Sequence, residues 1–180
     1  SHTMPRCFIR LYLPQRHSEA VIGPEMRAYL ARELGQDWGS LLLDPAAWDK
    51  LREAADELER ELGTRPPTRL CDVTREAEVR SLVDSAIAEL GRIDVLICNA
   101  GISQRSRFAE TTLDVFRTII EVNVMGPAAH IHAVLPVMRA QGSGHVVVTS
   151  SVAGKFGIPN RSAYCASKHA LEGISDALRM

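Results

Sequence analysis

The sequence predicts an α/β protein built on a parallel sheet with helices on both of its faces. Short apolar runs alternate with longer amphipathic segments five times along the 180 residues, which is the order that βαβ units produce. Two of the runs, residues 93–98 and 146–149, are rich in apolar and β-branched residues, as in strands that are buried on both faces. Gly35 and Gly91 follow amphipathic segments and mark helix ends.

The elements of the first half follow from these patterns. Residues 7–13 predict a first strand, although Arg10 stands in its middle, and a turn at 14–23 leads into a helix over about 25–34. Residues 40–43 predict a second strand. Residues 46–62 predict a charged amphipathic helix that ends at Gly63, and residues 68–73 predict a third strand.

The second half carries the clearer signals. The helix after the third strand has one apolar stripe, formed by Val79, Leu82, Val83, Ala86, Ile87 and Leu90. Residues 93–98 predict the fourth strand. A long helical segment over 111–140 follows, interrupted at Gly126-Pro127 and carrying Pro136. Residues 146–149 predict the fifth strand, and the alanine-rich stretch from Ser162 predicts the last helix.

Composition excludes several classes of protein. A net charge of −1 gives no basic footprint for nucleic acid, and no apolar run is long enough to cross a bilayer. The four cysteines lack ligand spacing, so we expect no metal site, and reduced thiols in a cytoplasmic protein. Residues 1–4 have the composition of a tag scar or a disordered start. We expect residues 5–180 to form a single domain.

Tyr164 and Lys168 are the strongest candidates for chemistry. They stand four residues apart on the predicted last helix, so they share one face, about one turn apart. A free phenol has a pKa of about 10, and a nearby ammonium lowers it toward the range useful for general acid–base catalysis. Such a pair also occurs by chance on many helices. The strand and the Ser151 hydroxyl that precede this helix favour the functional interpretation.

Four short motifs resemble those of one family. They are SSVAG at 150–154, YCASK at 164–168, IDVLICNAG at 93–101 and EVNV at 121–124. Together, and in this order, they resemble the classical form of the short-chain dehydrogenase/reductase family. The resemblance covers residues from about 50 to 180. Between residues 101 and 178 the sequence is most similar to those of the dehydrogenase/reductase members that act on steroids, retinoids and other carbonyls.

The resemblance implies a Rossmann-like, doubly wound fold in three layers (α/β/α), with strand order 3-2-1-4-5. Members of the family carry a sixth strand, a substrate-covering helical segment and a seventh strand. The sequence ends at Met180, inside the helix that holds Tyr164. We therefore expect the domain to be incomplete at its C-terminal end.

The resemblance also implies an activity. Members are NAD(P)-dependent oxidoreductases that interconvert a secondary alcohol and a ketone by hydride transfer. Tyr164 would exchange the proton of the substrate oxygen, and Ser151 would orient that oxygen. Lys168 would lower the pKa of the phenol and bind the nicotinamide ribose, and Asn123 would hold a relay water. We expect a homodimer or homotetramer formed through helices 111–140 and 162–180, with a small-molecule alcohol or ketone as substrate.

The residues implied for cofactor binding begin in the first half of the chain. The full set is Gly23, Asp44, Asp72, Val73, Asn99, Ala100, Gly101, Tyr164 and Lys168. Only Gly23 matches the glycine-rich loop of the family, because His17 and Val21 occupy the other places. We therefore expect weakened dinucleotide affinity, and the choice between NAD and NADP is left open. Asp44 and Asp72 could each cap a helix instead.

A second function is compatible with the same sequence. A truncated or degenerate relative could keep the scaffold, lack turnover and act through association of its helices. Residues 14–23 favour this alternative. The presence of Asn123, Ser151, Tyr164 and Lys168 favours the enzyme.

Overall fold

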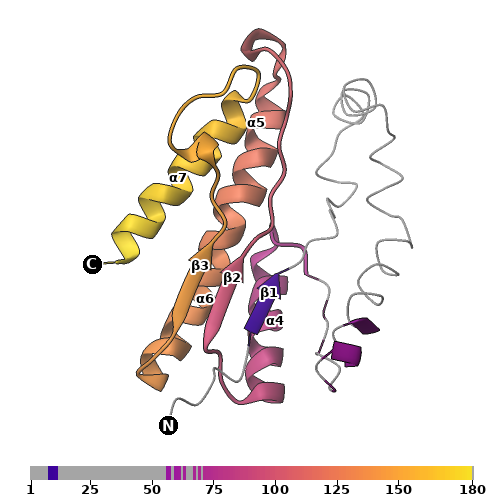
Figure 1. Cartoon of the computed structure of the whole chain (residues 1–180), viewed down its shortest axis with the longest axis vertical. Coiled ribbons are helices and arrows are strands. Elements are labelled where there is room, and N and C mark those ends of the chain that lie inside the picture. The colour runs from indigo at the N-terminus through magenta and orange to yellow at the C-terminus, as the bar shows by residue number, and fades with distance from the viewer. Residues whose placement is uncertain are drawn as a thin grey trace. The chain divides into compact units, whose positions relative to one another are not determined.

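The computed structural model describes residues 8–11, 56–57, 59–61, 63, 67, 69 and 71–179, with the backbone alone for 8–11 (Figure 1). The chain forms two compact units, residues 1–12 with 71–180, and residues 13–70. In the second unit residues 56–57 and 59–61 are helical. Gly63 follows with a φ of 70° and donates its N–H to the carbonyl of Glu59, so this predicted helix ends where the glycine indicates.

Three described strands form a parallel sheet. They are β1 (Phe8–Leu11), β2 (Val95–Cys98) and β3 (His145–Val148), in the order β1-β2-β3. Val95 pairs with Phe8 on one side and His145 on the other, and the three strands run side by side in Figure 1. They are the predicted first, fourth and fifth strands, and their order agrees with the 1-4-5 part of the prediction. Residues 40–43, the predicted second strand, lie outside the described residues.

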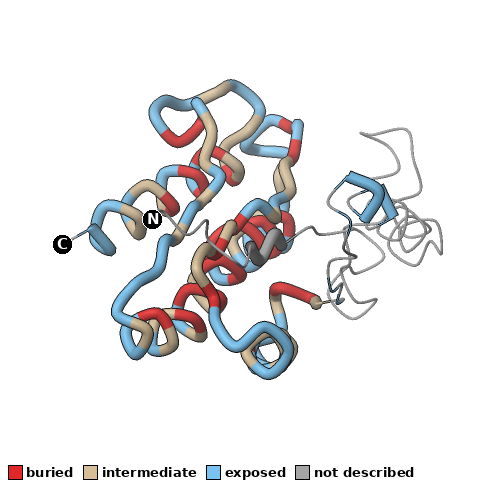
Figure 2. The backbone as a smooth tube through the Cα atoms, turned by 60° about the horizontal axis from the view of Figure 1, so that its bottom comes forward, coloured by how far each residue is buried: buried red, intermediate tan, exposed pale blue. Residues whose placement is uncertain are grey.

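Four described α-helices belong to the same unit, namely α4 (Glu76–Leu90), α5 (Leu113–Ile120), α6 (Gly126–Gln141) and α7 (Ser162–Leu178). Leu96 and Cys98 of β2 form one buried cluster with Val83 of α4 and Val134 of α6. Along each helix, buried positions alternate with exposed ones (Figure 2), because only one stripe of a helix can face a sheet. The predicted helix at 25–34 lies outside the described residues.

Gly91 and Gly142 end α4 and α6 in the left-handed conformation, with φ values of 76° and 71°. Each donates its N–H back to the last turn of its helix. The predicted end of the first of these helices at Gly91 is therefore confirmed. The three described cysteines, Cys71, Cys98 and Cys165, are free, and burial raises the pKa of the Cys98 thiol to about 12.

The predicted third strand differs from the structure. Its described residues, Arg69 and those at 71–73, are not in a strand. The Asp72 carboxylate accepts hydrogen bonds from the N–H of Thr74 at 3.0 Å and from its hydroxyl at 2.7 Å. The Asp72 carbonyl accepts from the N–H of Arg75. An aspartate that bonds the backbone two residues on favours a turn, and this turn leads directly into α4.

The long helical segment is interrupted earlier than predicted. Residues 121–125 form a single π-helical turn, η2 (Glu121–Met125), between α5 and α6. Pro127 has no N–H, so the α-helical hydrogen bond to the carbonyl of Asn123 cannot form. Instead, the N–H of Gly126 reaches back five residues to the carbonyl of Glu121. The prediction placed the break at Gly126-Pro127, whereas the proline changes the turn that precedes it.

Gly126 is needed for the packing of α6 on the segment before α4. A Cβ at this position would lie 2.9 Å from Cγ2 and 3.1 Å from Cβ of Val73, which is itself buried.

We expect Gly126→Ala to destabilise the fold by about 1–3 kcal/mol, because close-packed neighbours must shift. Gly173 of α7 has no atom within 4 Å of its ideal Cβ. Gly173→Ala should therefore stabilise the folded state by about 0.5–1 kcal/mol. Urea unfolding of both variants measures the contrast, and equal effects would contradict it.

His130 of α6 is buried and neutral. Its Nδ1 donates to the carbonyl of Gly126 at 2.8 Å, and Nε2 is buried with no hydrogen-bond partner among the described residues. Burial lowers the pKa of His130 below its ordinary value of 6.5, and the bond to Gly126 opposes this only in part. The unfolded chain therefore binds the proton more readily than the folded chain.

It follows that the folded state loses stability as the pH falls below about 6.5, by up to about 1.4 kcal/mol per pH unit from this group. We expect His130→Gln to flatten this part of the curve of unfolding free energy against pH. His132→Gln, on an exposed position of the same helix, is the matched control for the substitution itself. Parallel curves for the wild-type chain and the His130 variant would refute the assignment.

Candidate active site

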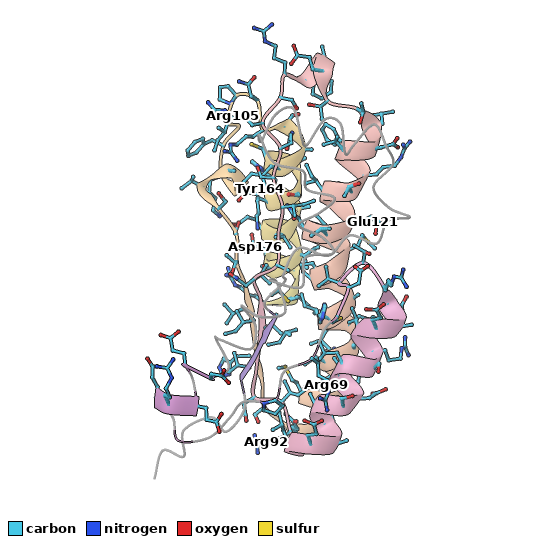
Figure 3. All side chains as sticks on the ribbon, turned by 90° about the vertical axis from the view of Figure 1, so that its right-hand side faces the viewer. Arg69, Arg92, Arg105, Glu121, Tyr164 and Asp176 are labelled. Atoms are coloured by element: carbon cyan, nitrogen blue, oxygen red, sulfur yellow. The ribbon has the colours of Figure 1, made fainter. Side chains whose placement is uncertain are left out.

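Tyr164 and Lys168 lie together on the first two turns of α7, as predicted from their spacing. The Lys168 ammonium nitrogen is 5.7 Å from the centre of the Tyr164 ring. Figure 3 labels Tyr164 on this helix. The phenol is half-buried, whereas only 4% of Lys168 is exposed. A phenol that solvent can still reach thus stands beside a buried cation.

The lysine is held by the end of β3. Its Nζ donates to the carbonyl of Thr149 at 2.7 Å, and burial lowers the pKa of Lys168 below its ordinary value. Among the described residues this is the one hydrogen bond of the ammonium, which has three donors. The remaining N–H groups can therefore bind oxygen atoms of a ligand.

Asn123, in the π-helical turn, is fully buried and bonded on all sides. Its Oδ1 accepts from the N–H of Ile102 at 2.8 Å, and its Nδ2 donates to the carbonyl of Ile102 at 2.8 Å and to the Ser167 hydroxyl at 2.9 Å. The Ser167 hydroxyl in turn donates to the carbonyl of Tyr164 at 2.7 Å. Asn123 therefore joins the loop after β2 to the helix that carries the tyrosine.

The segment Asn99-Ala100-Gly101 leaves β2 beside these groups. A Cβ on Gly101 would lie 3.3 Å from Oδ1 of Asn123 and 3.6 Å from Nζ of Lys168. The backbone thus passes close to two predicted catalytic side chains, which only glycine permits without displacement. Asn99 Oδ1 accepts from the Thr149 hydroxyl at 2.9 Å, so the ends of β2 and β3 are joined at this edge of the sheet.

Ser151 lies where the chain leaves β3 and enters a short 3₁₀ turn, η3 (Val152–Gly154). Its Oγ accepts from the N–H of Ala153 at 3.2 Å, and the residue is half-buried. The turn packs on α7. A Cβ on Gly154 would come within 3.0 Å of the carbonyl oxygen of Lys168. The serine hydroxyl keeps its proton available, because it accepts rather than donates in this bond.

The other predicted cofactor residues are placed less directly. Gly23 and Asp44 lie outside the described residues. Asp72 uses its carboxylate in the turn before α4, and its N–H donates to Glu78 Oε2 at 2.8 Å. Val73 is buried against Gly126. The roles of Asp72 and Val73 in cofactor binding stay predictions.

Several residues of the site give no signal in the sequence. The acceptor for Lys168 is a main-chain carbonyl, at Thr149, and any residue type supplies one. Gln104 bonds the N–H of Tyr164 from 60 residues away, and no spacing rule connects them. The part of the chain that the structure describes contains no group of three or more His, Cys, Asp or Glu residues able to hold a metal ion. It also has no helix that could span a membrane.

The fold and the site combine a parallel sheet and packed helices with a tyrosine–lysine pair at the carboxyl edge of the sheet. A family model described as short chain dehydrogenase matches residues 28–180. The chain belongs to the short-chain dehydrogenase family. Its Rossmann-like fold class, predicted from the sequence, is thereby confirmed.

Individual relatives support the same conclusion. Dehydrogenase/reductase SDR family member 7B of Danio rerio is 44% identical over 135 residues, which are 72% of this chain and 44% of the relative. A short chain dehydrogenase/reductase of Burkholderia phymatum, solved in complex with NAD, is 32% identical with a TM-score of 0.69. The match covers 75% of this chain and 47% of that one.

A short chain dehydrogenase of Shigella flexneri, solved with NADP, is 28% identical with a TM-score of 0.68. That match covers 72% of this chain and 56% of the other. The chain thus spans about half the length of the proteins that it matches. The predicted resemblance to the dehydrogenase/reductase members is confirmed by the relative from Danio rerio.

Proposed function

We propose that the protein containing this chain is an NAD(P)-dependent oxidoreductase that interconverts a secondary alcohol and a ketone. The observation that carries the proposal is the position of Lys168. Its buried ammonium lies 5.7 Å from the Tyr164 ring and has donors left over for a ligand. Structural neighbours with NAD and with NADP support both forms of the cofactor.

Each residue of the site has a distinct role in this proposal. In the direction of reduction, the Tyr164 hydroxyl gives its proton to the substrate oxygen, and in oxidation the phenolate takes it back. Lys168 would bind the nicotinamide ribose through the N–H donors that its bond to Thr149 leaves over. The Ser151 hydroxyl donates to the substrate oxygen and orients it. When bound, the nicotinamide supplies or accepts the hydride.

Asn123 supports this chemistry indirectly, by holding other parts of the site in place. Its three hydrogen bonds hold Ile102 and Ser167 in place, so it fixes the distance between the loop after β2 and α7. The side-chain amide has little capacity left for a relay water, because both Nδ2 protons are already donated. We therefore assign Asn123 a positioning role in preference to that of holding a relay water.

The described residues at the nicotinamide end of the site, around Gly101, fit the cofactor. Gly101 leaves open the space that a Cβ would fill beside Asn123 and Lys168, and close approach of backbone to a ligand is a common use of glycine. Asn99, Ala100, Tyr164 and Lys168 would contact the nicotinamide half. Gly23 would lie against the pyrophosphate. Asp44, Asp72 and Val73 would contact the adenine half. Assembly through the segments 111–140 and 162–180 stays a prediction.

The proposal is tested by following the hydride itself. The protein is incubated with a simple ketone and with NADH or NADPH deuterated at C4 of the nicotinamide, and the alcohol is analysed by mass spectrometry. We expect deuterium on the carbinol carbon. Ser151→Ala should lower the rate, since it removes the donor to the substrate oxygen, and Ser175→Ala, at a hydroxyl bonded within α7, is the matched control. Cofactor binding without transfer to any carbonyl would favour the inactive scaffold instead.

A further inference from the structure

The first turn of α7 has no cap within its own sequence. Arg161 occupies the cap position with φ −135° and ψ 36° and makes no side-chain capping bond. The first bond that the helix itself supplies runs from the N–H of Cys165 to the carbonyl of Arg161. The N–H groups ahead of Cys165 have no intrahelical acceptor, which is general for helix starts. The N–H of Tyr164 is one of them.

Gln104 supplies the missing acceptor from another loop. Its Oε1 accepts from the N–H of Tyr164 at 3.1 Å, and its Nε2 lies 3.5 Å from the Ser162 hydroxyl. Because an N–H can only donate, the amide atom that faces the N–H of Tyr164 must be the oxygen. Only 4% of Gln104 is exposed, so water cannot readily replace it. In Figure 3 its neighbour Arg105 and Tyr164 lie in the same part of the molecule.

The loop that carries Gln104 is anchored on both sides of it. Ser103 Oγ accepts from Arg161 Nη1 at 2.7 Å, and the N–H of Ser106 donates to the carbonyl of Asn160 at 3.0 Å. Ile102 is held by Asn123. The same loop begins at Gly101, next to the lysine. Gln104 therefore joins the main chain of Tyr164 to the segment on which a nicotinamide would lie.

We propose that Gln104 is a positioning residue for the reaction: it sets the place of Tyr164 relative to the segment that begins at Gly101. The proposal rests on the proposed function for Tyr164. It predicts that loss of the acceptor displaces the phenol and slows the chemical step, while cofactor binding is kept. A displacement of about 1 Å can cost about 100-fold in rate.

Three variants separate this role from general support of the loop. Gln104→Met keeps the shape and removes the acceptor. Gln104→Glu keeps an acceptor, to which the Ser162 hydroxyl can also donate. Ser103→Ala removes a neighbouring anchor of the same loop without touching Tyr164. We expect kcat to fall at least about tenfold for the Met variant with KM for the cofactor within about twofold, and to stay within about twofold for the other two.

A second measurement is independent of turnover. In chain labelled with nitrogen-15 tyrosine, the amide of Tyr164 is one of three tyrosine signals, assigned through Tyr164→Phe. We expect its hydrogen exchange to be at least about tenfold faster in the Met variant and protected in the Glu variant.

The outcomes are distinct. Unchanged kcat in the Met variant overturns the proposal, and so does an equal loss in Ser103→Ala, which would point to loop rigidity alone. Faster exchange with unchanged kcat would show that the bond is structural only and would also overturn it. If the Met variant does not fold, Gln104→Asn, one methylene shorter, should show the same split in smaller measure. A wild-type protein that contains this chain and transfers no deuteride defeats the proposed function itself.

Discussion

Tyr164→Phe should lower kcat by about 10²–10⁴-fold, the usual cost of losing a positioned general acid. The change removes one hydroxyl and keeps nearly all of the apolar volume. The residue is half-buried, and its described main-chain bonds, to Gln104 and to Ser167, do not use the side chain. The fold should therefore survive, with a melting temperature close to that of the wild type.

The measurement is a pH–rate profile with a simple ketone. The rate of the Phe variant should be low at every pH measured, because the exchangeable proton is lost. Lys168→Met is the companion variant. Loss of its ammonium should raise KM for the cofactor, because the ribose would lose the donors that Lys168 has left over. Wild-type turnover in the Phe variant would disprove the assignment of Tyr164.

Asn123→Ala should cost both stability and activity. It leaves the N–H and the carbonyl of Ile102 without the partner that Asn123, itself 0% exposed, supplies. Each buried group left unsatisfied costs about 1–3 kcal/mol, so a loss of roughly 2–6 kcal/mol in unfolding free energy is expected for the two groups. The loop that begins at Gly101 should loosen with it.

The chain contains a matched control for this variant. Gln141 makes the same two-way pair with a backbone, accepting from the N–H of Ile93 at 2.9 Å and donating to its carbonyl at 2.8 Å. This pair lies at the other end of α6, away from Tyr164. Gln141→Ala should lower the urea midpoint but leave turnover unchanged at a temperature where both variants are folded. Similar losses of turnover in both would contradict the role given to Asn123.

Much of the fold in residues 71–179 could be predicted because it is encoded locally. The stripe on α4 and the glycine at its end are properties of neighbouring residues, and both Val79 and Val83 of that stripe are buried. The structure of residues 68–73, the predicted third strand, could not be predicted from neighbouring residues alone. Whether residues at its position pair with a sheet depends on distant partners, whereas Asp72 bonds its own neighbour Thr74.

The candidate site divides along the same line. The proximity of Tyr164 and Lys168 follows from one helix, and it could be predicted from spacing alone. The bonds of Lys168 to the carbonyl of Thr149 and of Tyr164 to Gln104 join elements distant in sequence. Main-chain acceptors carry no residue signature, so patterns of side chains cannot reveal them. Such contacts become visible only when the elements are packed.

The π-helical turn at Glu121–Met125 has a consequence for how this chain can be altered. Each α-helical residue advances the direction of its side chain by about 100°, so an added residue shifts the phase of everything on one side relative to the other. α5 and α6 are therefore two helices out of phase, each with its own inward face. Deleting one residue of the turn would restore a continuous period and rotate either Asn123 or the buried stripe of α6 toward solvent. A surface loop would accept an inserted or deleted residue. At this turn, the same change would rotate α5 and α6 relative to each other and so misalign the site.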